Sequence, residues 1–384
     1  SFADAGKSFG TPINVSPAQG ATSVSVTPTL TASTYINLDG LAMAAAQWQI
    51  STASDFSSTV VSTGDIAGTS TSYTVPGSDS LTPVTLHYWR VRYKDSAGNY
   101  SDYSAATSFT SGVPVGQQAF TSSGSFSWTA PANVTSVSVV VVGAGGSGAK
   151  NHDAQGGGGG ALSYKNNITV SPGTSYTVSV GSGGTQRTGN GQMGVNGGDS
   201  YFINTSTVYA QGGRGGQQNS TTRTSGKVGD GGGEGGASAA SRGGFCGAGG
   251  YSGNGGDSEY SNSQPSAAPS GGGGSAAYNF DSQGSHGGGG VGILGEGASG
   301  AQTGSTFSTG NGRGGSGGAD GGFAISGSSH FQPSTRGDGG NYGGGGGRGT
   351  SQSDDVDGGA GAVGAVRIIW GSGRSFPSTN TTDQ

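Results

Sequence analysis

The feature that most constrains this chain is an abrupt change in glycine content at Gly143. Eleven of the 86 glycines precede this position and the other 75 lie at or after it, in a chain of 384 residues. Glycine has no Cβ and loses more conformational freedom on folding than any other residue. A glycine-rich chain therefore cannot fill an ordinary side-chain core, so the two parts of this chain need different ways of folding.

The charge and the cysteine content exclude several classes of protein. The formal net charge is −5, whereas nucleic-acid binders display basic surfaces that displace counterions. A single cysteine, Cys246, excludes a disulfide framework within the chain and any multi-cysteine metal site. No apolar run approaches the roughly 20 residues that a membrane-spanning helix needs. We therefore expect no nucleic-acid partner and no membrane insertion.

Residues 1–112 carry the pattern of an antiparallel β-sandwich, because short β-branched and aromatic runs alternate with turn residues and no helical period is present. The predicted strands are Ser23–Thr31, Ala46–Ser51, Ser72–Val75, Thr85–Tyr93 and Ala105–Thr110. The fourth strand alternates, which places four side chains on one face: His87, Trp89, Val91 and Tyr93. Arg90 and Arg92 are expected to face solvent.

The end of this segment resembles the last hairpin of a fibronectin type III domain. The resemblance rests on Tyr88–Tyr93, the turn at Asp95–Gly98, and an aromatic-Ser-x-aromatic-Ser bulge at residues 100–104. It implies that residues 1–112 form a fibronectin type III-like domain. Such domains usually serve as spacers or as binding modules, and a spacer is the favoured interpretation.

Residues 117–210 predict a second β-sandwich, completed by a strand from far along the chain. The predicted strands are Ala119–Trp128, Ser136–Val142, Leu162–Tyr164, Ile168–Val170, Tyr176–Val180, Ser200–Ile203 and Val208–Ala210. Ser136–Val142 is almost purely β-branched, so we expect it to be buried on both faces. The strand signal then vanishes and returns once, at residues 362–370. The region 211–361 is predicted to be an insertion anchored at both ends, and residues 371–384 a C-terminal tail.

Parts of the insertion repeat every three residues. Within 243–257 the glycines occupy two of every three phases, and a larger residue holds the third; 212–216 and 312–318 show a similar phase. A period of three matches the polyproline-II conformation and neither the α-helix nor the β-strand. Without Cβ atoms, neighbouring chains can approach closely enough to pair their backbone groups. We therefore predict a polyglycine-II helix bundle with a backbone core, in which Cys246 is a small buried filler.

Taken in order, these motifs resemble those of glycine-rich bacteriophage tail-fibre or tail-tip adhesins of the polyglycine-II type. The residues that carry the resemblance are Phe120-Thr121, Trp128–Pro131, Val141–Gly146, Gly156–Gly160, Val170–Gly173 and Gly364–Gly371. The resemblance implies a virion protein that is extracellular, forms a homo-oligomer (a trimer), and contacts other virion tail or fibre proteins. It also implies that loops between the glycine helices bind a bacterial surface receptor, either a glycan or an outer-membrane protein.

Glycine-poor segments interrupt the insertion and are predicted to be loops at the ends of the packed helices: 257–270, 275–283, 301–309, 323–336 and 350–357. Loops on a rigid scaffold commonly carry recognition. The candidate receptor-binding residues are the isolated aromatic side chains of these loops: Tyr260, Tyr278, Phe280, Phe307 and Phe331. Two alternatives stay open, a purely structural subunit of a fibre shaft, capsid decoration or extracellular filament, and a cellular surface adhesin.

Several short motifs favour structural interpretations over functional ones. Asp354, Asp355 and Asp357 lack the spacing of a calcium-binding loop, so a solvated loop is favoured. The tripeptide Arg336-Gly337-Asp338 and three Arg-Gly-Gly triplets are expected to arise from the high glycine content. The four histidines are scattered, and no Ser/His/Asp arrangement can be assembled from their spacing. The chain is therefore predicted to be non-enzymatic, with no catalytic residue, metal or cofactor.

Overall fold

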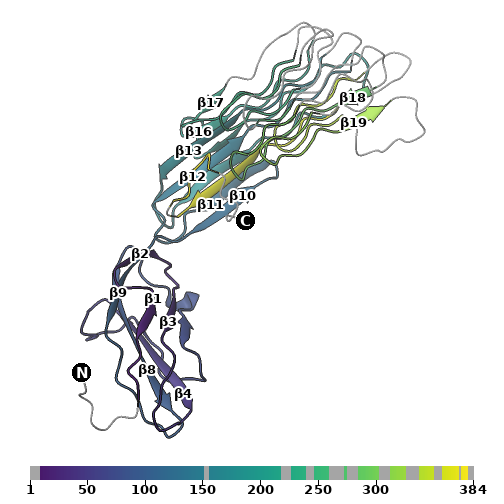
Figure 1. Cartoon of the computed structure of the whole chain (residues 1–384). Helices are drawn as coiled ribbons and strands as arrows, with labels where there is room; N and C mark the ends of the chain where they lie inside the picture. Colours follow the sequence, from purple (N-terminus) through teal and green to yellow (C-terminus); the bar gives the residue numbers. More distant parts are fainter. Residues whose placement is uncertain are drawn as a thin grey trace. The chain divides into compact units, whose positions relative to one another are not determined.

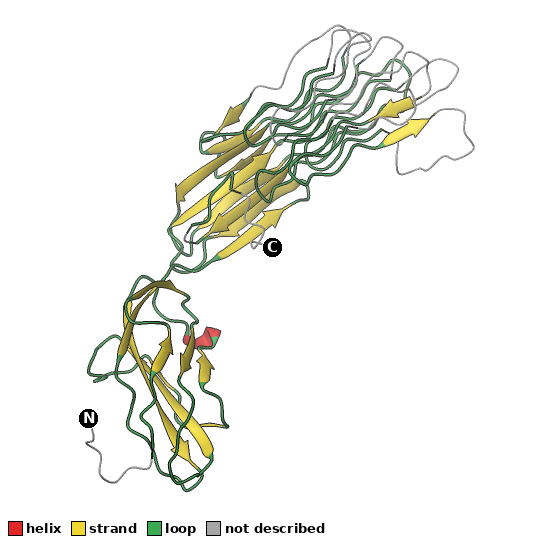
Figure 2. Cartoon of the chain, in the orientation of Figure 1, coloured by secondary structure: helices red, strands yellow, loops and turns green. Residues whose placement is uncertain are grey.

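The structure is a computed structural model of the whole chain. It describes residues 9–150, 155–217, 226–238, 246–258, 272–274, 284–301, 312–325, 337–349, 357–371 and 373–378. The fold is all-β, as predicted: the described residues form strands, and the helical element among them is a short 3-10 turn, η1 (Gly77–Asp79) (Figure 2). The chain divides into two compact units, Ser1–Val115 (unit 1) and Gly116–Gln384 (unit 2).

Unit 1 is a β-sandwich of two sheets. One sheet has the order β1-β3-β7, and the other has the order β2-β9-β8-β4-β5 with β6 also paired to β4. The strands are β1 (Asn14–Ser16), β2 (Ala21–Val24), β3 (Thr29–Ala32), β4 (Met43–Ser51), β5 (Val61–Ser62), β6 (Ile66–Ala67), β7 (Ser72–Thr74), β8 (Leu86–Asp95) and β9 (Thr107–Ser111). The long antiparallel pair β4 and β8 forms the centre of the larger sheet.

The buried face of β8 is the one that the sequence predicts. His87, Trp89, Val91 and Tyr93 are each at most 1% exposed. Trp89 stacks on Trp48 of β4, with ring centroids 6.0 Å apart. The single strand predicted at Ser23–Thr31 is wrong, because β2 and β3 belong to different sheets. Pro28 lies between them and cannot donate a backbone hydrogen bond, so the chain crosses from one sheet to the other there.

Unit 2 begins with a second sandwich, whose two sheets have the orders β10-β20-β12-β13 and β11-β14-β15-β16-β17 (Figure 1). The strands are β10 (Gly116–Phe120), β11 (Gly124–Thr129), β12 (Ser136–Val142), β13 (Leu162–Thr169), β14 (Ser175–Val180), β15 (Ser200–Phe202), β16 (Val208–Ala210), β17 (Lys227–Val228) and β20 (Ala365–Trp370). β20 lies between β10 and β12, so the prediction that a distant strand completes this sheet is confirmed.

Two strand predictions need correction in this sandwich. The single strand Ala119–Trp128 is in fact β10 and β11, one in each sheet, and Gly124 at the start of β11 has a φ of 146° that favours glycine. The predicted pair Leu162–Tyr164 and Ile168–Val170 is one continuous strand, β13, with a register irregularity opposite Val137–Val139. A β-bulge of this kind interrupts the sequence alternation without ending the strand.

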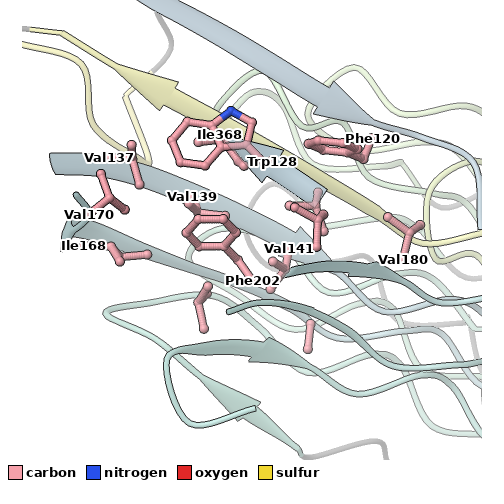
Figure 3. Close-up of a cluster of buried hydrophobic side chains, with 14 of the residues drawn as sticks. Phe120, Trp128, Val137, Val139, Val141, Ile168, Val170, Val180, Phe202 and Ile368 are labelled. Carbon is pink, nitrogen blue, oxygen red and sulfur yellow. The ribbon is translucent and has the colours of Figure 1, made fainter. Parts of the chain in front are cut away.

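β12 is buried on both faces, as predicted, and each face has a different cover. Val137, Val139 and Val141 point into the sandwich core with Trp128 and Phe202 (Figure 3). The opposite face carries Val140 and Val142. These two valines pack against residues contributed by the glycine-rich region and by the C-terminal tail: Ala248, Tyr251, Val291, Ile293 and Phe376. This second core attaches the glycine-rich region to the sandwich.

The segment after β12, residues 143–150, shows how the glycine-rich region is held together. Its amides donate to three neighbouring segments in strict rotation. The amides of Gly143, Gly146 and Ala149 donate to the first neighbour, at Ala161, Gly158 and Gln155 respectively. Those of Ala144, Ser147 and Lys150 donate to the second neighbour, at Gly198, Val195 and Gln192. Those of Gly145 and Gly148 donate to the third, at Ala362 and Gly359. All eight bonds are between 2.8 and 3.1 Å. The hydrogen bonding therefore repeats every three residues.

The carbonyl groups of residues 143–150 accept from three further segments. Gly213 and Gly216 donate to Ala144 and Ser147, Gly346 and Gly349 donate to Gly146 and Ala149, and Gly184 donates to Gly145. Residues 143–150 thus have six hydrogen-bonded neighbours and are buried throughout. We call this arrangement of side-by-side segments the glycine lattice.

The glycine lattice confirms the period of three and corrects two other points. It includes residues 143–150, 155–161 and 181–199, whereas the predicted insertion begins at residue 211. The described lattice segments are extended chains that bond to their neighbours, and no bundle of helices is present among them. Two short strands, β18 (Gly284–His286) and β19 (Phe323–Ile325), pair within the region where no strand was predicted. Cys246 is fully buried, as expected.

The glycines are required by the spacing of the segments. A Cβ on Gly145 would lie 1.9 Å from the carbonyl oxygen of Gly344, and one on Gly148 would lie 1.8 Å from that of Gly347. Real Cβ atoms do not approach backbone atoms so closely, so a side chain here must push two segments apart and break the bonds that join them.

We predict that Gly148→Ala lowers the free energy of unfolding of unit 2 by about 3 kcal/mol or more, at the upper end of the cost of overpacking. The matched control is Gly297→Ala, where the nearest atom to the added Cβ is Ser316 Cα at 3.1 Å and the site is exposed. Urea unfolding followed by circular dichroism gives both values. If both substitutions lowered the free energy of unfolding equally, the close approach of the segments at Gly148 would be contradicted.

Unit 1 contains a buried histidine whose titration affects stability. The ring of His87 packs 5.5 Å from that of Phe109, and its Nδ1 atom is buried without a partner. Burial lowers the pKa of His87 below its ordinary value of 6.5. The unfolded chain therefore takes up the proton first when the pH falls through 6.5, and stability is lost below that pH.

We predict that unit 1 is less stable below pH 6.5 than above it, by up to about 1.4 kcal/mol per pH unit, and that His87→Phe removes most of this dependence. The substituted ring keeps the contact with Phe109. The measurement is urea unfolding of both proteins on either side of that pH. An unchanged pH dependence in the variant would assign the effect to carboxylates instead.

Candidate functional site

The described glycine segments run side by side away from the sandwich (Figure 1), and we call their ends remote from the sandwich the distal end of the lattice. Lys150, eight residues after β12, bridges to Gln192 of one segment and to Gly349 of another. Arg187 bridges to Gly358 in the same way. These residues come from parts of the chain that lie up to about 200 positions apart, so the lattice gathers distant sequence at one place.

A buried ion pair fastens three segments at the distal end. The side chain of Lys150 is 3% exposed, and its Nζ donates to Asp357 Oδ1 at 2.7 Å and to the carbonyl oxygen of Thr188 at 2.9 Å. Gln186 lies 3.4 Å from the other carboxylate oxygen of Asp357. A buried ammonium needs such partners to offset its lost hydration. Asp357 therefore has a structural role here, while Asp354 and Asp355 lie outside the described residues.

One connection at the distal end is described in full, the turn at residues 185–193. Its exposed residues include Thr188, Asn190, Gln192 and Met193. The turn is held to the lattice because the amide of Gly191 donates to the carbonyl oxygen of Lys150 at 2.8 Å. Gly191 has a φ of 78°, which favours glycine. The turn thus presents polar side chains from a fixed backbone.

Asn and Asp side chains complete the hydrogen bonding at the lattice edges. Asn196 Oδ1 accepts from the amide of Gly215 at 2.8 Å, and Asp199 Oδ1 accepts from that of Gly212 at 2.9 Å. The same pair recurs once more: Asn254 accepts from Glu234 at 2.9 Å, and Asp257 accepts from Ala237 at 2.8 Å. The two residues of each pair are three positions apart, so their side-chain oxygens accept from backbone amides with the same period of three that the backbone bonds have.

A tyrosine supports one of these edge contacts. Tyr209 donates its hydroxyl to Asp199 Oδ2 at 2.8 Å. Burial, together with the hydrogen bond to Asp199 and the charge of that carboxylate, raises the pKa of Tyr209 to about 12. The hydroxyl therefore stays protonated and keeps the carboxylate oriented toward Gly212.

The structure leaves the predicted receptor-binding residues undetermined. Tyr260, Tyr278, Phe280, Phe307 and Phe331 all lie outside the described residues. The stretches that contain them are each bounded on both sides by described lattice residues. Asp338, from the integrin-type tripeptide, accepts from the amide of Ala360 at 2.8 Å and so completes a lattice contact. Arg313, from one Arg-Gly-Gly triplet, forms an ion pair with Asp320 at 3.0 Å.

The described part of the chain offers no arrangement typical of a metal centre. Within it, no group of three or more His, Cys, Asp or Glu residues is placed to hold a metal ion. Its two described histidines lie in different units, His87 in β8 and His286 in β18. Within the described ranges no helix is long and apolar enough to cross a membrane.

Comparison with known proteins supports this architecture. A family model described as a glycine-rich domain matches residues 121–371, which is more than half of the chain. The chain belongs to this glycine-rich domain family. A second model, described as a Rha78A-like N-terminal immunoglobulin domain, matches residues 35–114. The N-terminal sandwich is therefore immunoglobulin-like, while the finer fibronectin type III assignment stays a prediction. No curated protein matches the chain.

Two solved structures show distant similarity. An α-L-rhamnosidase from Dictyoglumus thermophilum is 15% identical over 36% of this chain and 20% of its own, with a TM-score of 0.24. An α-L-rhamnosidase from Streptomyces avermitilis complexed with L-rhamnose is 12% identical over 45% of this chain and 23% of its own, with a TM-score of 0.22. This chain thus matches about a fifth of their length, and scores this low carry no argument about fold or activity.

Sequence reasoning missed the edge residues, although a signal for them was present. The string Asn-Gly-Gly-Asp occurs at 196–199 and again at 254–257, and Asp-Gly-Gly-Asn occurs at 338–341. Each string places acceptor side chains three residues apart, in step with the lattice. The Lys150–Asp357 pair left no comparable signal, because 207 residues separate its partners.

We predict that Asn196→Ala destabilises unit 2 by about 1 kcal/mol, because the buried amide of Gly215 loses its acceptor. Asn196→Asp keeps an acceptor oxygen at the same position and is expected to avoid most of this loss. Hydrogen exchange at Gly215 should quicken in the first variant only. The control is Asn190→Ala in the exposed turn, which should leave stability unchanged.

Proposed function

We propose that this protein is a non-enzymatic virion adhesin, which recognises a bacterial surface receptor through loops displayed at the distal end of the glycine lattice. The observation that carries the proposal is the six-neighbour hydrogen bonding of residues 143–150. It gathers the ends of segments from distant parts of the chain and fixes their separation. Receptor binding by many short loops needs this kind of support.

The residues that hold the lattice of unit 2 together support a role in displaying loops. The described lattice is held by backbone bonds, by Asn and Asp side chains at its edges, and by the Lys150–Asp357 pair. All of these contacts are made by residues other than the five candidate aromatic residues, which lie outside the described part of the chain. Changes at those five residues are therefore compatible with an intact lattice, which suits surfaces that must match different receptors.

The proposal extends to location and assembly. The period of three in the hydrogen bonds is the one that polyglycine-II segments of tail-fibre adhesins would give, and the glycine-rich motifs resemble that family. On this basis we propose a virion-surface, extracellular protein that assembles as a trimer and contacts other tail or fibre proteins. The receptor is a glycan or an outer-membrane protein of the host.

We predict that replacing Tyr260, Tyr278, Phe280, Phe307 and Phe331 together with alanine abolishes adsorption of the virion to its host. Thermal unfolding of the purified protein should stay unchanged, because the described lattice contacts are made by other residues. The matched control is Tyr342→Ala, which removes an aromatic residue packed against the second core of unit 2 and should lower stability.

Two outcomes would count against the adhesin. If adsorption survives all five changes, the loops do not carry the receptor site. If labelled antibody to this chain decorates a fibre shaft or a shell in electron micrographs of the particle, the chain is a structural subunit. A label confined to fibre tips supports the adhesin.

A further inference from the structure

The solvent-facing side of β8 in unit 1 carries a continuous row of stacked cations and rings. Arg90 lies between the rings of Phe56 and Tyr103, at 4.1 and 4.2 Å from their centroids. Arg92 lies between Tyr103 and Tyr100, at 4.6 and 4.2 Å, and Lys94 lies 5.0 Å from Tyr100. We call these six side chains the arginine row.

The arginine row is fixed from its base by two glutamines of β4. Arg90 Nε donates to Gln49 Oε1, and Arg92 Nε donates to Gln47 Oε1, both at 2.8 Å. Each guanidinium is thereby held in one plane, sandwiched between rings and bonded through its inner edge. Such a group has lost much of its rotational freedom before any ligand arrives.

The outer edges of the two guanidinium groups are available. The terminal nitrogens of Arg90 and Arg92 have no acceptor among the described residues, and they are not buried. The ion pair of the row is at the end formed by Lys94, whose Nζ lies 2.7 Å from Asp65 Oδ2. A planar fork of donors with no protein acceptor matches a carboxylate geometrically and electrostatically.

The side chains in and around the row limit the classes of ligand that it can bind. Both faces of Tyr103 are covered by guanidinium groups, so this ring cannot stack on a neutral sugar. The exposed large apolar side chains among the described residues of unit 1 are not members of the row: Ile13, Val15, Ile36, Leu38, Val60, Val84, Leu86 and Val115. The anchors of a protein interface insert their rings and guanidinium groups into the partner, whereas those of the row already pack against one another and leave hydrogen-bond donors at their outer edges.

The spacing of the arginines indicates a ligand with repeated charges. Arg90 and Arg92 are two residues apart on β8, on the same face, so their Cα atoms lie about 7 Å apart. One carboxylate cannot fill both forks, but successive acidic groups of a polymer can. We propose that the arginine row binds a polysaccharide that carries carboxylate groups. This site is in unit 1 and is independent of the receptor proposed for the loops of unit 2.

The test is isothermal titration calorimetry of the full chain with polygalacturonate. Binding should be lost with the methyl ester of the same polymer, which has no charge, and should weaken as salt is added. Arg90→Gln combined with Arg92→Gln should weaken binding at least tenfold, about the effect of losing one charge-assisted contact. The control is Arg214→Gln, an exposed arginine of unit 2, which should bind as the unchanged protein does.

Arg92→Lys keeps the charge but loses the planar fork and the bond from Nε to Gln47, so it is expected to bind more weakly while still folding. This second variant keeps the test decisive if the double variant does not fold. The proposal is overturned if the unchanged protein does not bind, if the methyl ester binds equally well, or if both variants bind as the unchanged protein does. Equal affinity for single-stranded DNA would assign the row to polyanions in general and would also overturn it.

Discussion

Backbone hydrogen bonding between neighbouring glycine segments is the interaction on which the rest of unit 2 depends. Residues 143–150 donate to three segments and accept from three others, and every described contact of this kind requires a close approach of two backbones. An added Cβ would stand 1.8 to 1.9 Å from a carbonyl oxygen at Gly148 and Gly145. Ordering so much glycine is unfavourable in entropy. The bonds in six directions offset that cost collectively, so the lattice is cooperative and short glycine tracts would not form it.

The sandwich supplies what the glycine lattice lacks, namely a hydrophobic core of packed side chains. β12 carries valines on both faces, and the outer pair, Val140 and Val142, packs against Tyr251 and Phe376. β20 returns the chain to the middle of the same sheet, between β10 and β12. The glycine-rich region is therefore anchored at both ends and along one side. An anchored chain loses less entropy on ordering than a free tail does.

The sequence predicts the parts of this fold that depend on periodicity. The period of three, the doubly buried strand at 136–142 and the returning strand at 362–370 are all visible in the order of the residues. Which segments become neighbours is not visible, because a glycine has no side chain to specify its partner. For that reason the sequence assigns the lattice segments at 143–150, 155–161 and 181–199 to the sandwich alone. The Lys150–Asp357 pair depends on that unspecified arrangement and was missed with it.

The edges of the lattice explain how it can be both ordered and limited in size. An outermost segment has amides with no neighbour to accept them, and further segments could add there as strands add to an open sheet edge. Asn196, Asp199, Asn254 and Asp257 accept from such amides with their own side chains. Their side chains end the pattern without disturbing its period. Asp257 and Asp357, which stand at the ends of two glycine-poor segments, are the residues of those segments whose side chains bond to the described lattice in this way.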